Sequence, residues 1–384
     1  MSAASTQGVA CARPDAATAA APQVVVPAGP RLLQKACILG AGAFGTALAQ
    51  LLARNGVAAT VWTRSEDTMA MINSQHLNTP YLAEIQLSPN VVATTSVAEA
   101  MEGADLVLFA IPTPFLREFL VSHRDLLPMR ALLLICSKGI ENVTLLTPFE
   151  ILEEELPGKY HKFLACLSGP SFAREVALGK PTSVTVAARD LAVAQRVQMA
   201  ISDKNFRVYT SNDIMGVEVF GAVKNVLAIA CGSSDGLDFG LNARAALITR
   251  GMAEIARLAI RKGASPLSMG GLCGVGDLVL TCTGSLSRNW TVGYRLAQGE
   301  TLGEIKASTR QVAEGVATAQ SVHDLAASLG IDLPICEEVY QVLYKDKRVI
   351  DALATLQGRP LTDDLHLELG QEGAFGVTPA PSTK

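Results

Sequence analysis

The most constraining feature of the sequence is a short apolar run that breaks into a glycine-rich turn. Residues 35–39 are apolar enough for a buried strand, and Gly40, Gly42 and Gly45 follow in the pattern G-x-G-x-x-G. Residues 46–54 have apolar side chains at helical spacing, and residues 57–62 again suit a strand. This order of strand, turn, helix and strand within about 30 residues predicts the first unit of a doubly wound parallel sheet.

The three glycines have distinct physical reasons for their positions. Gly40 permits the tight turn, Gly42 lets the backbone approach a pyrophosphate closely, and Gly45 lets the helix pack against the strand. The unpaired N–H groups at the start of the helix then face the phosphates. The motif alone would also suit an ordinary glycine turn, but with these flanking elements it predicts dinucleotide binding.

The end of the second expected strand does not choose between NAD and NADP. NAD-specific sites usually place an Asp or Glu there to bind the ribose 2′-OH. This chain has Arg64 shortly after Trp62, and its first acid, Glu66, comes slightly late. Arg64 suits the 2′-phosphate of NADP, but a solvated surface arginine fits the position equally well. We therefore expect NAD or NADP as the cofactor.

Further apolar runs continue the alternation of strands and helices. Residues 105–111, 131–136, 163–167, 182–188 and 207–210 are expected to be strands. Near-continuous apolar strands that alternate with helices are typical of a mostly parallel sheet covered on both faces. In such sheets, ligands bind beyond the carboxyl ends of the strands.

The pattern changes after residue 211, where long apolar helices replace the strands. Residues 213–231, with Gly232 as the stop, and residues 242–262 suit helices. The expected fold class is an α/β N-terminal Rossmann-like, doubly wound sheet plus an all-α C-terminal domain. The expected parts are a flexible leader (1–34), an NAD(P)-binding Rossmann domain (35–211), a helical substrate and catalytic domain (212–355) and a flexible tail (356–384).

Composition limits the partners and the compartment. The formal charge is only −4, which argues against a nucleic-acid partner. No apolar run reaches the roughly 18 residues that a membrane span needs, so we expect no span. The eight cysteines are scattered, so we expect buried thiols in a reducing compartment and no metal site. We expect the cytoplasm, with a plastid or another organelle as the alternative, since residues 1–34 are Ala- and Ser-rich but poor in arginine.

Three cationic side chains are candidates for chemistry. Lys224 lies among apolar helix residues, where burial favours the neutral amine of a general acid or base, although a lysine snorkelling to the surface is the alternative. Lys138 follows the expected strand 131–136, where an exposed loop lysine is equally consistent. Arg288 follows the glycine-rich stretch 270–276 and offers the bidentate fork suited to a phosphate.

Six sequence blocks occur between residues 35 and 355 in a characteristic order and spacing: residues 137–139, 168–176, 221–242, 276–283, 287–289 and 312–315. These blocks resemble the NAD(P)-dependent sn-glycerol-3-phosphate dehydrogenase family, most of all its bacterial-type branch. The resemblance implies reversible hydride transfer between NAD(P)H and dihydroxyacetone phosphate, which gives sn-glycerol 3-phosphate and links glycolysis to glycerolipid synthesis and redox balance. It also implies a homodimer.

The resemblance further implies roles for individual residues. Lys224 matches the family's proton donor and acceptor, and the other implied catalytic residues are Lys138, Asp277 and Thr281. The implied substrate contacts are Lys138, Lys224, Ser287, Arg288 and Asn289. The implied cofactor contacts are Gly40, Gly42, Ala43, Phe44, Gly45, Arg64, Lys138, Ala173, Arg288 and Glu314.

Two features depart from the family pattern. Ala43 replaces a hydroxyl residue that is common in bacterial members, and the leader has no counterpart there. Two other functions fit part of the sequence: a related two-domain dehydrogenase of β-hydroxy acids or acyl-CoA, and a non-catalytic NAD(P)-binding protein. The second would be expected to lose the lysines and the phosphate-binding residues, and this chain retains Lys138, Lys224 and Arg288.

Overall fold

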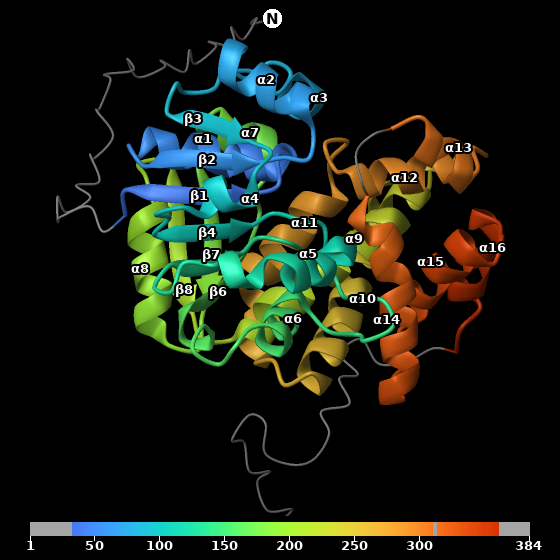
Figure 1. Cartoon of the computed structure of the whole chain (residues 1–384). Coiled ribbons are helices and arrows are strands. Elements are labelled where there is room, and N and C mark those ends of the chain that lie inside the picture. The colour runs from blue at the N-terminus through green and yellow to red at the C-terminus, as the bar shows by residue number, and fades with distance from the viewer. Residues whose placement is uncertain (1–32, 310–312, 361–384) are drawn as a thin grey trace, which may run out of the picture.

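The computed structural model describes residues 33–309 and 313–360. The expected leader, except for its last two residues, and the expected tail beyond residue 360 lie outside the described residues. Leu33, two residues before the first strand, is already buried in the core. Figure 1 shows the sheet and its helices in blue and green beside a group of helices in yellow to red.

Eight strands form one sheet in the order β3-β2-β1-β4-β5-β6-β7-β8. The first six follow the strand order of dinucleotide-binding folds, in which the connections reverse direction between β1 and β4. This arrangement confirms the predicted α/β class. The strands are β1 (Lys35–Leu39), β2 (Ala58–Trp62), β3 (Val91–Thr94), β4 (Leu106–Phe109), β5 (Leu132–Ile135), β6 (Leu164–Ser168), β7 (Thr182–Ala187) and β8 (Phe206–Ser211).

Both faces of the sheet are buried because successive side chains of each strand point to opposite faces. In β1, Ala36 and Ile38 join a core cluster with residues of α1 and α8, whereas Cys37 and Leu39 join a second cluster with residues of α5 and α6. The helices of this part are α1 (Ala43–Arg54), α2 (Glu66–Gln75), α3 (Thr79–Leu82), α4 (Val97–Met101), α5 (Leu116–His123), α6 (Pro148–Glu155), α7 (Ala173–Ala177) and α8 (Leu191–Ile201).

The sheet differs from expectation at two places. The short strand β3 is missing from the expected set, because Val92 is exposed at the sheet edge and only four residues form the strand. The second difference is β7, which runs antiparallel to β6 while the other neighbouring pairs are parallel. A single antiparallel step leaves the predicted, mostly parallel sheet otherwise intact.

The second half of the chain is helical, and its centre is α9 (Ile214–Gly236). This helix packs against α10, α11, α12 and α14, and also against strand β6. Its position between the helices and the sheet explains why apolar residues surround almost its whole circumference. The other helices are α10 (Gly240–Arg261), α11 (Asp277–Cys282), α12 (Arg288–Ala297), α13 (Leu302–Ala307), α14 (Glu314–Leu329), α15 (Pro334–Tyr344) and α16 (Val349–Gln357).

The expected end of α9 at Gly232 is wrong. The helix continues to Gly236, and Gly232 instead provides a close contact with α12. A Cβ on Gly232 would lie 1.9 Å from the carbonyl oxygen of Trp290, and a Cβ on Gly293 would lie 1.9 Å from that of Ile229. The two glycines therefore let the backbones of α9 and α12 touch.

Helix α9 is long and apolar enough to cross a membrane by length and composition alone. It is the one such helix in the described part of the chain, and 83% of its most apolar window is buried inside the protein. A buried core helix passes the same test, and the packing of α9 on all sides accounts for its composition.

The close contact between α9 and α12 predicts that Gly293→Ala is strongly destabilising. The added methyl group would overlap backbone atoms of α9, which cannot rotate away, so the free energy of unfolding should fall by about 1–3 kcal/mol or more. Denaturant unfolding of both proteins measures the difference. Gly303→Ala in α13 is the matched control, because its Cβ would meet only the Thr301 hydroxyl at 3.9 Å; equal stability of the two variants would contradict the proposed contact.

Candidate active site

A buried carboxylate, Asp277, holds two lysine ammonium groups. Its Oδ1 accepts a hydrogen bond from Lys224 Nζ at 2.5 Å, and its Oδ2 accepts one from Lys138 Nζ at 2.9 Å. Asp277 is 1% exposed and Lys224 is 6% exposed. Three separate elements meet here, namely α9, the first turn of α11 and the segment after β5. The structure therefore brings the predicted catalytic residues together.

Thr281 completes the surroundings of Lys224. Its hydroxyl accepts a hydrogen bond from Lys224 Nζ at 2.8 Å and donates one to the backbone carbonyl of Asp277 at 2.6 Å, one turn earlier in α11. Because an ammonium group has three donors and two are used by Asp277 and Thr281, one donor of Lys224 is available for a substrate oxygen.

The pKa values of the two lysines in this cluster are shifted in opposite directions. Burial lowers the pKa of Lys224 to about 8, with Lys138 adding to the shift and Asp277 opposing it. Burial would also lower the pKa of Lys138, but the attraction of Asp277 outweighs it and the pKa lies above its usual value. The pKa of Asp277 is lowered, because the two lysines overcome the effect of its burial. Lys224 is thus the lysine that releases its proton more easily.

The position of Lys138 is fixed at the carboxyl end of β5. The Ser137 hydroxyl donates to the Ile111 carbonyl at 2.5 Å, and the Thr113 hydroxyl donates to the Lys138 carbonyl at 3.1 Å. Gly139 follows with a φ of 142°, and a Cβ there would lie 2.9 Å from the Thr113 hydroxyl. The backbone can therefore turn sharply after Lys138 only with glycine at this position.

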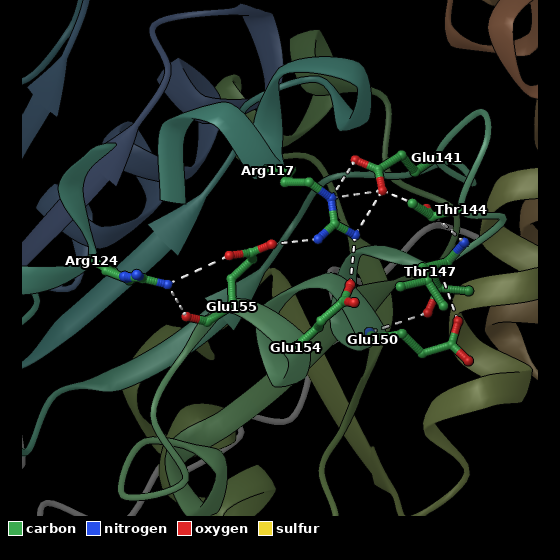
Figure 2. A network of polar contacts seen from close by, with 9 residues as sticks. Arg117, Arg124, Glu141, Thr144, Thr147, Glu150, Glu154 and Glu155 are labelled. Atoms are coloured by element: carbon green, nitrogen blue, oxygen red, sulfur yellow. Dashed lines mark hydrogen bonds and ion pairs between the residues drawn. The ribbon is translucent and has the colours of Figure 1, made fainter. Parts of the chain in front are cut away.

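An ion-pair network anchors the segment that follows Lys138 (Figure 2). Arg117 of α5 binds Glu141 through Nη2 at 2.8 Å, and the same guanidinium also binds Glu154 and Glu155 of α6. From the helical half of the chain, the Ser321 hydroxyl of α14 donates to the Ile140 carbonyl at 2.7 Å. The segment that carries Lys138 is therefore held by both halves of the molecule.

A second cluster, Ser287–Asn289, lies at the start of α12. The buried Ser287 is the N-cap residue, and its hydroxyl accepts the Trp290 N–H at 3.3 Å. Asn289 is also buried and accepts the Gly315 N–H at 2.9 Å. The Arg288 side chain is exposed and forms no ion pair or hydrogen bond with the part of the chain that the structure describes. A free guanidinium at a helix N-terminus suits a phosphate group.

Glu314, the first residue of α14, lies near both clusters. Burial raises the pKa of its carboxyl group, while the positive charges of Arg288, Lys138 and Lys224 act in the opposite direction. The predicted cofactor contact Glu314 is thus close enough to the predicted catalytic and phosphate-binding residues to interact with their charges.

The glycine turn fits a pyrophosphate. A Cβ on Gly42 would meet nothing within 4 Å, so the space in front of the turn is open, whereas a Cβ on Gly45 would lie 2.0 Å from the Gly40 carbonyl oxygen. Gly40 has a φ of 120° and closely approaches Ala110 of the strand-end segment after β4. As N-cap, Gly42 has no side chain to bond the first N–H groups of α1, which leaves them available for a phosphate.

Four other predicted cofactor contacts lie on α1, on α7 and after β2. Ala43 and Phe44 form the start of α1, and both pack with Ala173 of α7 against the same core cluster. Arg64 is exposed after β2, with its guanidinium carbon 5.8 Å from the centre of the Phe115 ring. Glu66 is turned to another partner, since its carboxylate accepts a hydrogen bond from Thr95 at 3.0 Å.

Sequence reasoning missed two buried residues around the site. Asn78, fully buried, donates to the Ala41 carbonyl at 2.8 Å and to the Thr46 hydroxyl at 2.7 Å, which fastens the glycine turn from a distant segment. No local pattern indicates this contact, because Asn78 lies more than thirty residues away along the chain.

The second missed residue is Glu218, six residues before Lys224 in α9. Its carboxyl group accepts the Phe149 N–H at 3.1 Å, and burial raises its pKa to about 8. It lines a cavity of ≈10 Å3 together with Lys138 and Ser168, which is room for about one water molecule. An acid among apolar helix residues is the same signal that singled out Lys224, and it could have identified Glu218.

Comparisons with known proteins decide the family. The N-terminal model of the NAD-dependent glycerol-3-phosphate dehydrogenase family matches residues 35–194, and the C-terminal model matches residues 213–354. The chain belongs to this family. It is therefore an NAD(P)-dependent oxidoreductase, as the resemblance predicted.

The chain also aligns with relatives named glycerol-3-phosphate dehydrogenase (NAD(P)+), and the alignments cover almost the whole length of those relatives. The protein of Myxococcus xanthus is 49% identical over 328 residues, which are 85% of this chain and 98% of the relative. The protein of Leptospira biflexa serovar Patoc is 46% identical over 324 residues, with 84% and 97% covered. Both relatives are bacterial, in agreement with the predicted bacterial-type branch.

Solved structures give the same result. Glycerol-3-phosphate dehydrogenase from Coxiella burnetii has a TM-score of 0.80 at 34% identity and covers 85% of this chain and 99% of that chain. A D-mandelate dehydrogenase has a TM-score of 0.56 at 15% identity, over 83% of this chain and all of that chain, and so shares the fold alone. The roles of individual site residues stay predictions, which the variants below test.

Lys224→Ala should lower turnover by at least about 10²–10⁴-fold, because the site loses a buried proton donor with a lowered pKa. Cofactor affinity should stay nearly unchanged. Steady-state kinetics and NADH titration by fluorescence measure the two quantities. Lys306→Ala, at an exposed position of α13, is the control and should retain full activity. Turnover of even a few per cent in Lys224→Ala would remove Lys224 from its predicted role.

The lowered pKa of Lys224 predicts opposite pH dependences for the two directions of catalysis. Carbonyl reduction needs the ammonium form, so its kcat/KM, which reports the free enzyme, should fall as the pH rises through about 8. Alcohol oxidation needs the neutral amine, so its kcat/KM should rise over the same range. Initial rates measured in both directions between pH 6 and 10 check this. The midpoints of the two profiles should lie within about one pH unit of the expected value. Parallel profiles for both directions would contradict the assignment.

Proposed function

We propose that the chain catalyses the reversible reduction of dihydroxyacetone phosphate to sn-glycerol 3-phosphate with NADH or NADPH. The observation that carries this proposal is the pair of lysines on buried Asp277, with Arg288, which is exposed and unpaired among the described residues, at the nearby start of α12. One cluster suits a carbonyl that is being protonated, and the other suits a phosphate. Dihydroxyacetone phosphate has both groups on three carbon atoms.

The chain's own residues bind the substrate and move one proton. When bound at the glycine turn, NAD(P)H supplies the hydride for substrate C2. The available N–H of Lys224 donates a proton to the C2 oxygen, while the ammonium group of Lys138 stabilises the charge that develops there. Asp277 keeps the two ammonium groups together, and Thr281 fixes the direction of Lys224.

The other end of the substrate binds at α12. Arg288 supplies a bidentate guanidinium, and the N-terminus of the helix adds the positive end of its dipole. The Ser287 hydroxyl and the Asn289 side chain are held in place by their contacts to Trp290 and Gly315. A phosphate fixed here places the carbonyl at a constant distance from Lys224, which is the contribution that positioning makes to catalysis.

The test is oxidation of NADH and of NADPH on addition of dihydroxyacetone phosphate to the purified protein. Turnover with either cofactor is the expected result. Turnover of a β-hydroxy or β-keto carboxylate in place of the triose phosphate would establish the rival dehydrogenase activity. Cofactor binding without any turnover would leave the non-catalytic alternative.

Arg64 is proposed to allow NADP as well as NAD. Arg64 follows the end of β2, and its guanidinium lies over the Phe115 ring. The Glu66 carboxylate is bound by the Thr95 hydroxyl. Arg64→Ala should raise the KM for NADPH by about tenfold or more, since a charge-assisted hydrogen bond to the 2′-phosphate is lost, and leave the KM for NADH within about twofold. Kinetics with both cofactors measure this ratio. A KM for NADPH that does not change would show that Arg64 is a solvated surface residue.

Three wider features are part of the same proposal. A homodimer agrees with the large exposed Leu241 side chain on the half-exposed first part of α10. A reducing compartment, first of all the cytoplasm with a plastid or other organelle as alternative, agrees with the free, buried cysteines of the described residues. The product, sn-glycerol 3-phosphate, would supply glycerolipid synthesis. Light scattering for mass, and imaging of fusions with and without residues 1–34, test the first two.

A further inference from the structure

The indole of Trp290 is tied to the end of α9 by a charged hydrogen bond. Its Nε1–H donates to Asp235 Oδ2 at 2.6 Å. The other carboxylate oxygen of Asp235 lies 3.1 Å from Arg244 Nε, at the start of α10. Asp235 is mostly buried, with 11% of its side chain exposed. Both oxygens of one carboxylate therefore connect three helices.

Trp290 is the residue directly after Arg288 and Asn289. Its backbone N–H is bound by the Ser287 hydroxyl, and its side chain is bound by Asp235. The indole is also stacked on Tyr294, one turn later in α12, with ring centres 5.0 Å apart. The first turn of α12 is thus held at its backbone by the N-cap and at its side chain by α9.

The rest of α12 has little freedom to move as a body. Gly293 and Gly232 bring the backbones of α9 and α12 into contact, and the Ser233 hydroxyl donates to the Gly293 carbonyl at 3.2 Å. The orientation of the first turn, which carries Arg288, depends in addition on side-chain contacts of its own residues. Asn289 binds the Gly315 N–H, and the Trp290 indole binds Asp235, which is the contact of this turn with the end of α9.

We propose that Asp235 is a positioning residue for substrate phosphate: through the Trp290 indole it sets the orientation of the Ser287–Asn289 turn that binds the phosphate. This inference rests on the proposed function for the identity of the phosphate compound. Asp235 itself is not one of the residues proposed to contact substrate or cofactor. Arg244 keeps the carboxylate neutralised, since an unpaired negative charge beneath this turn would repel a phosphate dianion.

Trp290→Phe is the direct test, because phenylalanine keeps an aromatic ring for Tyr294 and removes the indole N–H together with part of the ring volume. We expect the KM for dihydroxyacetone phosphate to rise about five- to tenfold, with kcat and the KM for NADH within about twofold. The dissociation constant of inorganic phosphate, titrated calorimetrically into the NADH-loaded protein, should rise by the same factor. A general loss of packing would not confine its effect to phosphate.

Two further variants separate the hydrogen bond from the charge. Asp235→Asn keeps an acceptor for the indole, so its phosphate affinity should stay much closer to the unchanged protein than that of Asp235→Leu, which has no acceptor. Tyr294→Phe is the matched control, because it leaves the Trp290–Asp235 bond intact and should bind phosphate normally. Thermal unfolding of each variant confirms that it is folded.

The outcomes distinguish this inference from the proposed function. Unchanged phosphate affinity in folded Trp290→Phe or Asp235→Leu would overturn the positioning role, even if the enzyme turns over dihydroxyacetone phosphate. A loss in Asp235→Asn as large as in Asp235→Leu would also overturn it, by showing that charge rather than the hydrogen bond matters. Absence of turnover in the unchanged protein, with phosphate affinity still dependent on Trp290, would instead remove the proposed substrate and keep the positioning role.

Discussion

The buried carboxylate of Asp277 is the contact on which the rest of the site depends. Two ammonium groups, one of them almost fully buried, would be expensive to remove from water without a counter-charge between them. Asp277 reaches both only if the first turn of α11, the middle of α9 and the end of β5 meet at one point. The fold therefore has to bring together segments that are more than fifty residues apart in sequence before the chemistry exists.

Helix α9 shows how close packing serves that requirement. Its glycines allow backbone contact with α12, its Lys224 reaches Asp277, and its Glu218 binds the first turn of α6. A helix rich in glycine and carrying two buried ionisable groups is not stable by its own propensity. Its stability comes from the helices and the strand packed around it. The stretch of α9 that carries Glu218 and Lys224 is therefore also a closely packed stretch of the helix.

Periodicity predicted most of the fold, since β1, β4, β5 and β6 are buried on both faces and their sequences are almost wholly apolar. The edge strand β3 was missed because exposed Val92 weakens that pattern, and α9 was ended too early because a glycine inside a helix is locally identical to a glycine that stops one. At the site, the apolar surroundings of Lys224 were a local signal, whereas its Asp277 partner came from family resemblance alone. Contacts such as Asn78 with Ala41 or Asp235 with Trp290 depend on tertiary structure and leave no periodic trace.

The net charge of the chain and the charge of its site have opposite signs, and this difference has a consequence for catalysis. Although the chain is acidic overall, Lys138, Lys224 and Arg288 outnumber Asp277 and Glu314 at the site, so an anionic substrate is attracted locally. Repulsion from Lys138 is one reason for the lowered pKa of Lys224 before substrate binds. A bound phosphate dianion offsets that repulsion and favours the protonated amine. Binding the phosphate thus shifts Lys224 toward the form that can donate the proton, so that the same group which positions the substrate also prepares the acid that acts on it.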